Sequence, residues 1–520
     1  MGTIINKFGQ VVNGVIKGFD RIVFKGMVRP IMFAAGMQSH LMSQNVLNKD
    51  FKTYAMSKSK AIVDYAEETS KNHTGKSTIY IPSSNERKEA LAHKQQKEAG
   101  IKDGLIGVWS CVESCLTYRS SFNPGATYPM LRHEQSRCKH LYFYLDDPTY
   151  GFMSIRLQTW APYEIQIALN GREWLRRSLD LVGCTYVLHG NKFLHIDDYE
   201  LAQKFLDKQL EADFEKILNG FVPMAFPLMQ EILPNMSYYW TLWQSELATD
   251  YIFDKPESLN PLMGNLMRYA LISGTGDRIL KYFGSPIDAK GQPHPKSNPE
   301  ILSRAKFWYD GLRVKHWNGK NSVKFYNEHN VLRFEMTMND PSKYKIYRHA
   351  ENQDKSEPKK LMPIRKGIAD ITARAKVSKG ITDRFIEQME TVEETTSLET
   401  LLSEVSSPLF KDGKRIRGLD VFGKDLQFIK ALSDPAFGVS AITNKELQNK
   451  LADTDWAKGK TSKQLSGKIS RHLFMLRKHG LIRKLPNQRK YELTDKGRKL
   501  TTAVNATLAS PVESLLKLAS

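Results

Sequence analysis

The sequence predicts an α+β multidomain protein, in which a body of mixed antiparallel sheet and helices precedes a small helical module with a basic hairpin. Three observations support this fold class. The chain has 520 residues, of which 41% are hydrophobic, which is enough to bury several cores. Short runs rich in aromatic and β-branched residues lie within 141–196 and 312–340. Apolar residues recur at helical spacing near the end of the chain.

These patterns divide the chain into five regions. Residues 1–110 are expected to be mostly helical, and 111–350 form the α+β body. Residues 351–423 are a helical linker region that begins with the polar stretch "ENQDKSEPKKLM". The small module covers 424–505, and 506–520 form a tail.

The net charge of +20 is concentrated near the end of the chain. Residues 424–500 hold 18 Lys and Arg and 7 Asp and Glu, a net of +11, which leaves +9 for all other residues. Such a surplus implies an anionic partner, most simply a phosphate backbone. No apolar run reaches the length of a membrane helix, and four cysteines are too few for a disulfide scaffold. We therefore expect a cytoplasmic protein without a membrane partner; homo-oligomer formation is left open.

Two helices and a hairpin are predicted within the basic region. In "TNKELQNKLAD" two leucines lie one turn apart, which indicates a short amphipathic helix. A longer helix is expected from 461 to 479, with Gly480 as its glycine cap. "LIRKL" and "RKYEL", on either side of "PNQ", predict a hairpin. The residues of the longer helix that would face a core are Leu465, Ile469, Leu473 and Leu476.

This order of elements is that of a winged helix-turn-helix. The segment resembles the DNA-binding module of MarR-like bacterial regulators, in which a helix ending in "HGLI", a basic wing and "YELTDKGR" recur. The resemblance implies that the helix 461–479 enters the major groove of duplex DNA and that the wing reaches the flanking backbone. The alternative is a module that contacts protein, or a charged helix that is only solvated. By their chemistry, the residues expected at base edges are Lys463, Gln464, Lys468 and Arg471, and those expected at phosphates are Arg483, Arg489 and Lys490.

A strand pair in the body suggests a catalytic alternative. "VKFYN" and "LRFEM" belong to three strands expected between 312 and 340. The pair is similar to strands of rolling-circle replication initiators and related nicking enzymes, where a tyrosine attacks a phosphodiester and a carboxylate holds the metal. That resemblance implies Tyr326 as nucleophile and Glu335 as metal ligand, although the His-hydrophobe-His motif of many such enzymes is absent. The other interpretation is a polar strand face that packs or grips a nucleic-acid backbone.

Pairs of carboxylates at strand ends are further candidates. Asp146 and Asp147 follow one expected strand, and Asp197 and Asp198 follow another. Such pairs hold Mg²⁺ in nucleases, and Glu335 would supply a third ligand. The same residues are also ordinary turn and cap residues. Motifs for nucleotide hydrolysis, dinucleotide binding or serine hydrolysis do not occur.

Four residues offer thiolate and imidazole ligands: Cys111, Cys115, Cys138 and His140. They form C-x3-C and C-x-H pairs separated by a loop, a set that suits tetrahedral zinc. The spacing departs from the usual two-residue gap, and we expect the two side chains of the C-x-H pair to diverge. The alternative is that the cysteines are small buried hydrophobic residues.

Taken in order, several segments resemble a widespread family of bacterial proteins to which no function is attached. They include "FDRIVFKG", "SCVESC", "RCKHLYFY", "GFMSIRLQTWAP" and "RVKHWNGKNSVKFY". We therefore expect a DNA-binding protein, either a transcriptional regulator or a protein associated with a mobile element. The alternatives are a mobile-element enzyme that nicks or transposes DNA at a metal-dependent site in the body, and a protein that binds structured RNA through aromatic and basic strands.

Overall fold

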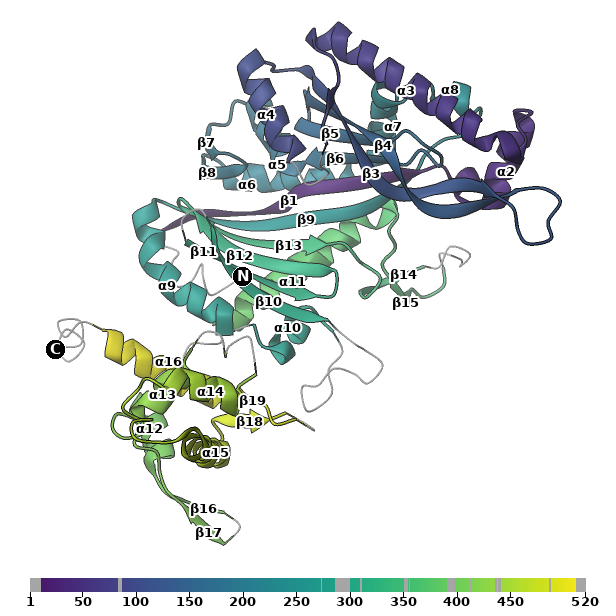
Figure 1. The fold of residues 1–520 in the computed structure, drawn as a ribbon. Helices are drawn as coiled ribbons and strands as arrows, with labels where there is room; N and C mark the ends of the chain where they lie inside the picture. Colours follow the sequence, from purple (N-terminus) through teal and green to yellow (C-terminus); the bar gives the residue numbers. More distant parts are fainter. Residues whose placement is uncertain are drawn as a thin grey trace. The chain divides into compact units, whose positions relative to one another are not determined.

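The computed structural model has both helices and a large sheet, and it confirms the α+β prediction (Figure 1). Its chain divides into two compact units, one formed by 8–259 and 319–382 and the other by 1–7, 260–318 and 383–520. The chain passes between the units more than once, so the five successive regions differ from this division. The described residues are 11–82, 87–272, 274–285, 300–308, 311–349, 354, 356–390, 398–411, 413–434, 437, 441–485 and 488–510.

The first unit is built on one sheet whose strands follow the order β12-β13-β9-β1-β6-β5-β4-β3-β2. Neighbouring strands are antiparallel, except that β2 and β3 are parallel. The bounds are β1 Val12–Met27, β2 Ile79–Tyr80, β3 Gly104–Ser121, β4 Met130–Asp147, β5 Gly151–Gln158, β6 Ile165–Asn170, β9 Tyr239–Phe253, β12 Asn321–Glu328 and β13 Val331–Met338.

Strands β1 and β9 run side by side through the middle of this sheet (Figure 1). The sequence pattern predicted neither strand: β1 lies in the region 1–110 that was expected to be mostly helical, and β9 lies outside the stretches 141–196 and 312–340 in which strands were expected. Long stretches of each are buried on both faces, and polar residues such as Ser245, Thr249 and Asp250 occupy some of the buried positions. The alternation of apolar and polar residues that indicates a strand is therefore hidden, whereas it is clear in β6, where Ile165, Ile167 and Leu169 are buried.

Helices cover both faces of the sheet. Residues of α2, α3 and α7 pack on the largest core, and α5 and α6 pack on a second core that includes Ile16 of β1. The bounds are α2 Ala34–Ser43, α3 Phe51–Thr74, α4 Lys88–Ala99, α5 Gly171–Leu181, α6 Tyr199–Lys208, α7 Phe214–Ala225, α8 Met229–Ile232 and α11 Ile371–Glu390; two small hairpins are β7 Tyr186–His189 with β8 Lys192–Ile196, and β14 Lys345–Arg348 with β15 Lys360–Pro363. In the described part of the chain, no helix is both long and apolar enough to cross a membrane.

The second unit contains α9 (Pro256–Ile272) in large part, α10 (Gly276–Tyr282) and the antiparallel strands β10 (Ile301–Trp308) and β11 (Gly311–Asn318). Its C-terminal part, which we call the C-terminal module, has one apolar core of its own. The module consists of α12 Leu398–Ser406, β16 Leu409–Lys411, β17 Lys414–Ile416, α13 Leu426–Leu432, α14 Asn444–Leu451, α15 Ser462–Lys478, β18 Ile482–Lys484, β19 Tyr491–Leu493 and α16 Asp495–Ala509.

The two helices and the hairpin predicted in the module are all present, as α14, α15 and β18–β19. All four apolar residues expected on the inner face of α15 are buried, and Gly480 follows the helix with φ of +75°, which suits a glycine. One feature differs from the expected pattern. The connection 452–461 is longer than the three or four residues of a helix-turn-helix turn, and it contributes Trp456 to the core.

A buried carboxylate lies at the centre of the first unit. Asp250 of β9 faces Arg333 of β13 in the strand register and accepts two hydrogen bonds from its guanidinium, at 2.6 and 2.8 Å. Arg172 of α5 lies 2.9 Å from the same carboxylate, and all three side chains are almost fully buried. Burial acts to raise the pKa of Asp250, but the charges of Arg333 and Arg172 outweigh it and hold the pKa below its usual value. We call these three residues the Asp250 network.

We expect Asp250→Ala to lower the free energy of unfolding by about 3–5 kcal/mol, because two buried guanidinium groups then have only Asp20 to share. Urea unfolding followed by intrinsic fluorescence measures the change. The control is Asp64→Ala, which breaks an exposed ion pair with Lys60 on α3 and should cost less than about 1 kcal/mol. Equal losses in the two variants would show that the Asp250 network has no special role.

Candidate functional site

The strongest concentration of positive charge lies on α15 and the hairpin that follows it. Residues 462–490 contain nine Lys and Arg and no Asp or Glu. Among the described residues, six of these basic side chains are exposed and form no ion pair with a carboxylate. They are Lys463, Arg471, Arg477, Lys484, Arg489 and Lys490, and we call them the basic surface.

Helix α15 is fixed by contacts along its other side. The buried carboxylate of Asp425, next to the start of α13, accepts a hydrogen bond from His472 at 3.1 Å and two from Arg417 at 2.7 Å. Burial opposes ionisation of Asp425, but these hydrogen bonds prevail and lower its pKa. The His472 ring also packs against Phe428 and Trp456. These contacts set the rotation of α15 about its axis and turn Lys463, Arg471 and Arg477 outward.

Two of the four predicted base-edge residues have structural roles. The Lys468 ammonium lies 3.6 Å from the centre of the Trp456 ring and donates to the Trp456 carbonyl at 2.9 Å, and burial lowers the pKa of this lysine. Gln464 forms a capping box with Thr461 at the helix start. Lys463 and Arg471 remain exposed. Sequence reasoning missed Phe474, which is 47% exposed, and Arg477; both follow Arg471 at helical spacing, which is the signal that could have found them.

The three predicted phosphate-binding residues of the hairpin differ in whether they form an ion pair. Arg483 of β18 forms an ion pair with Glu492, its partner in the register with β19. Arg489 and Lys490 are exposed on the segment that leads into β19. Lys484, which was not predicted, is exposed as well. Within the described residues, the hairpin therefore adds three exposed cations without an ion pair, Lys484, Arg489 and Lys490, to those of α15.

A second candidate site lies in the first unit, where three carboxylates converge. Asp20 of β1, Glu246 of β9 and Glu335 of β13 come from three adjacent strands, and their oxygen atoms lie within 4.8 Å of one another. Asp20 occupies a bulge, because the register of β1 with β9 shifts between Phe19 and Arg21. A bulge redirects a side chain, which is why such features are frequent beside active sites. We call this set the carboxylate cluster.

Two members of the cluster line a cavity of about 440 Å³. Its wall also includes Asn170, which caps the start of α5, and Asn191, which donates to Asp20 at 2.6 Å. Further residues of the wall are Arg21, Glu89, His93, Phe152 and Glu173. The cavity therefore presents carboxylate and amide oxygens, which are the ligands of hard divalent cations.

The carboxylate cluster is largely neutralised by neighbouring cations. Lys324 forms an ion pair with Glu335 across the strands, and Arg333 lies 3.1 Å from Asp20. Burial, reinforced by the charge of Glu335, raises the pKa of Glu246 to about 7. At neutral pH Glu246 is thus poised to exchange a proton, and a divalent ion would have to displace that proton.

The structure disagrees with the other catalytic candidates. The Tyr326 side chain is only 5% exposed, and burial raises its pKa well above the usual value, which opposes its use as a nucleophile. Asp146 is bound by Gln96 and Arg177, and Asp147 caps a turn. Four strands, β5, β6, β1 and β9, separate their strand from that of Glu335. Glu335 therefore joins two carboxylates that sequence reasoning missed, because they come from strands distant in sequence.

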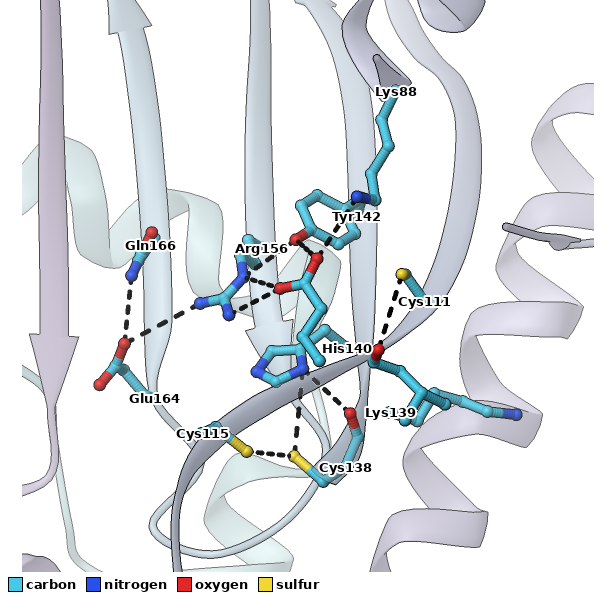
Figure 2. Close-up of polar contacts among 12 residues, drawn as sticks. Lys88, Cys111, Cys115, Cys138, Lys139, His140, Tyr142, Arg156, Glu164 and Gln166 are labelled. Carbon is cyan, nitrogen blue, oxygen red and sulfur yellow. Dashed lines mark hydrogen bonds and ion pairs between the residues drawn. The ribbon is translucent and has the colours of Figure 1, made fainter. Parts of the chain in front are cut away.

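The predicted metal ligands are brought together in part (Figure 2). The sulfur atoms of Cys115 and Cys138 lie 2.7 Å apart, and Nδ1 of His140 lies 4.0 Å from the sulfur of Cys138. The sulfur of Cys111 is outside this group and contacts the carbonyl of Val112. Residues 138 and 140 are two apart on β4 and share a face, so our expectation that their side chains diverge was wrong.

The two thiols polarise each other. A thiolate at Cys115 accepts a hydrogen bond from the Cys138 thiol, which lowers the pKa of Cys115 to about 5 and raises that of Cys138. A neighbouring partly buried carboxylate already has partners: Glu113, which faces Cys138 in the register, accepts hydrogen bonds from Arg156 at 2.9 Å and from Tyr142 at 2.5 Å. We call Cys115, Cys138 and His140 the thiol–imidazole cluster.

Comparisons with protein-family models, with curated proteins and with solved structures find no match to this chain. The function of this chain is therefore inferred from its own residues and their geometry.

We expect Glu246→Gln to change how stability depends on pH. The pKa of Glu246 is raised on folding, so its contribution is complete below about 4.5 and is lost as pH rises through about 7. Between pH 4.5 and 8 the wild type should lose up to about 3 kcal/mol relative to the variant. Urea unfolding across this range measures the difference, and parallel profiles would contradict the assignment.

Proposed function

We propose that this chain binds duplex DNA through the basic surface of its C-terminal module, which acts as a winged helix. The observation that carries the proposal is that six of the nine basic residues in 462–490 are exposed without an ion pair in the described part of the chain, and that this stretch contains no acidic residue. Charge without internal partners is the signature of a surface that binds phosphate. The function of a regulator or of a mobile-element protein fits this binding mode.

The anchored orientation of α15 supports a proposed role for several exposed residues. Arg471 would read a guanine through a bidentate contact in the major groove, and Phe474 would contact a thymine methyl group. Lys484, Arg489 and Lys490 would neutralise phosphates beside the groove and make binding depend on salt. Lys468, held on Trp456, supports the helix from behind.

We expect Arg471→Ala to weaken binding to a preferred duplex by about 1–3 kcal/mol, roughly 5- to 150-fold in affinity, because one base contact is lost. The duplex is first selected from a random pool with the full-length protein, and affinity is then measured by gel shift. Lys60→Ala, which removes an exposed lysine of α3 in the first unit, is the charge-matched control and should bind normally. Unchanged affinity in Arg471→Ala would remove α15 from the interface.

Two further measurements separate the alternatives. Lys468→Ala should lower the melting temperature of the module more than Arg471→Ala does, since it removes a packed contact. A selection that returns structured RNA in preference to duplex DNA would overturn the proposal in favour of RNA binding.

A second candidate function is divalent-metal-dependent cleavage of phosphodiesters in the first unit. It is favoured by one observation, the convergence of Asp20, Glu246 and Glu335 beside a cavity. These carboxylates would hold Mg²⁺ once Glu246 is deprotonated, and the metal would supply activation of the attacking water. Tyr326 has no part in this version of the mechanism.

For this second candidate we expect Mg²⁺-dependent nicking of supercoiled DNA that is abolished in Asp20→Asn and Glu246→Gln, because each removes a charged ligand. Tyr326→Phe is the matched control and should keep its activity. Nicking that survives both carboxylate changes, or is lost in Tyr326→Phe alone, would sink the cluster as the catalytic site.

A further inference from the structure

We propose that Cys115, Cys138 and His140 bind a zinc ion, with three protein ligands and a fourth position that faces a basic cavity. The inference does not rest on DNA binding or on the carboxylate cluster, because its residues belong to other strands of the sheet. Four observations support it: the ligand atoms converge, His140 has one ring nitrogen without a partner among the described residues, neighbouring residues already contact other groups, and a cavity lies beside Cys138.

Convergence is set by the β3–β4 register. Cys115 faces Ser136 and Cys138 faces Glu113, so the two thiols are offset by two positions on adjacent strands, and His140 follows on the same face of β4. The sulfur atoms and an imidazole nitrogen lie within 4.8 Å of one another, and the three residues are each at least nine-tenths buried. Thiolate and imidazole are the ligands that zinc prefers.

The hydrogen bonding of His140 is the most specific sign of a ligand. The residue has no exposed surface, and Nδ1 lies 3.2 Å from the carbonyl oxygen of Cys138. A proton on Nδ1 donates to this oxygen, so Nε2 carries a lone pair. Nε2 is buried and has no hydrogen-bond partner among the described residues. Leaving a buried acceptor unpaired costs about 1–3 kcal/mol, whereas a metal-bound histidine typically donates its other nitrogen to just such a carbonyl.

Sulfur positions are compatible with a shared ion after a small adjustment. Two thiolates at about 2.3 Å from a tetrahedral zinc are roughly 3.8 Å apart, compared with 2.7 Å here. Rotation of the two cysteine side chains can move the sulfur atoms apart by about 1 Å while the strands stay in place. A disulfide between the same two residues would require the sulfurs to close to about 2.05 Å, and it would leave Nε2 unpaired.

No fourth protein ligand is at hand among the described residues. Cys111 faces His140 in the register, but its sulfur lies outside the group and contacts the carbonyl of Val112, and Glu113 is held by Arg156 and Tyr142. Three protein ligands with an open position are typical of zinc that binds water or a substrate. Cys138 lies in the wall of a cavity of about 610 Å³ that also presents Lys49, Lys52 and Arg137, together with Arg119 in an ion pair with Glu134. An anion in this cavity could therefore complete the coordination.

We expect full-length protein, purified under reducing conditions, to contain stoichiometric zinc when measured by inductively coupled plasma mass spectrometry. Cys115→Ser, Cys138→Ser and His140→Gln should lose most of it. Cys111→Ser is the matched control, because Cys111 is a buried cysteine on the same strand whose sulfur is outside the cluster, and it should retain the metal. Wild-type protein without metal, or equal loss in Cys111→Ser, would overturn the proposal.

A second measurement protects the test against variants that fail to fold. Wild-type protein stripped by chelator and reloaded with Co²⁺ should show the visible bands of a thiolate-bound tetrahedral ion, and inorganic phosphate should perturb them if the fourth position is open. Bands that phosphate leaves unchanged would overturn the open position, and absence of bands would overturn the site. An intact mass that is lower than the mass of the reduced protein by two hydrogen atoms would show a Cys115–Cys138 disulfide. That result would also overturn the zinc site.

Discussion

A single buried carboxylate constrains the first unit more than any other group. Asp250 cannot be buried without compensation, and it obtains this from Arg333 on the neighbouring strand and Arg172 on a helix. The pairing fixes the register of β9 with β13 and holds the start of α5 against the sheet, where Gly171 leaves no room for a side chain beside the carbonyl of Phe19. Glu246 and Glu335 lie on these two strands, and Asp20 lies on β1, which pairs with β9, so the positions of all three carboxylates depend on this arrangement.

The C-terminal module also depends on a buried carboxylate with cationic partners. Asp425 is buried, and its bonds to Arg417 and His472 determine which side of α15 meets the core. In both units a buried acid therefore decides the direction in which the neighbouring charged residues point. The consequence differs: in the first unit, Arg333 and Lys324 turn inward and neutralise carboxylates, whereas on α15 Lys463, Arg471 and Arg477 turn outward.

The thiol–imidazole cluster lacks this kind of compensation. Every carboxylate of the carboxylate cluster has a cation or a proton to balance it, while Nε2 of His140 is buried and has no hydrogen-bond partner among the described residues. This nitrogen lies beside two buried thiols, and a shared metal ion would satisfy all three groups. This contrast is the physical reason for assigning a metal to the thiols before assigning one to the carboxylates.

Local patterns in the sequence determined the α+β class, the strands of 312–340, the helices and hairpin of the module, and the glycine that ends α15, because each depends on residues close together in the chain. Tertiary structure alone decided the rest. Strands β1 and β9 are buried on both faces and lose their alternation, and Asp20, Glu246 and Glu335 meet only through strand order. A lysine such as Lys468 can donate hydrogen bonds to base edges, but packing of its ammonium on Trp456 gives it a structural role. Spacing reveals which residues share a face, whereas the neighbours of that face are set by contacts between distant segments.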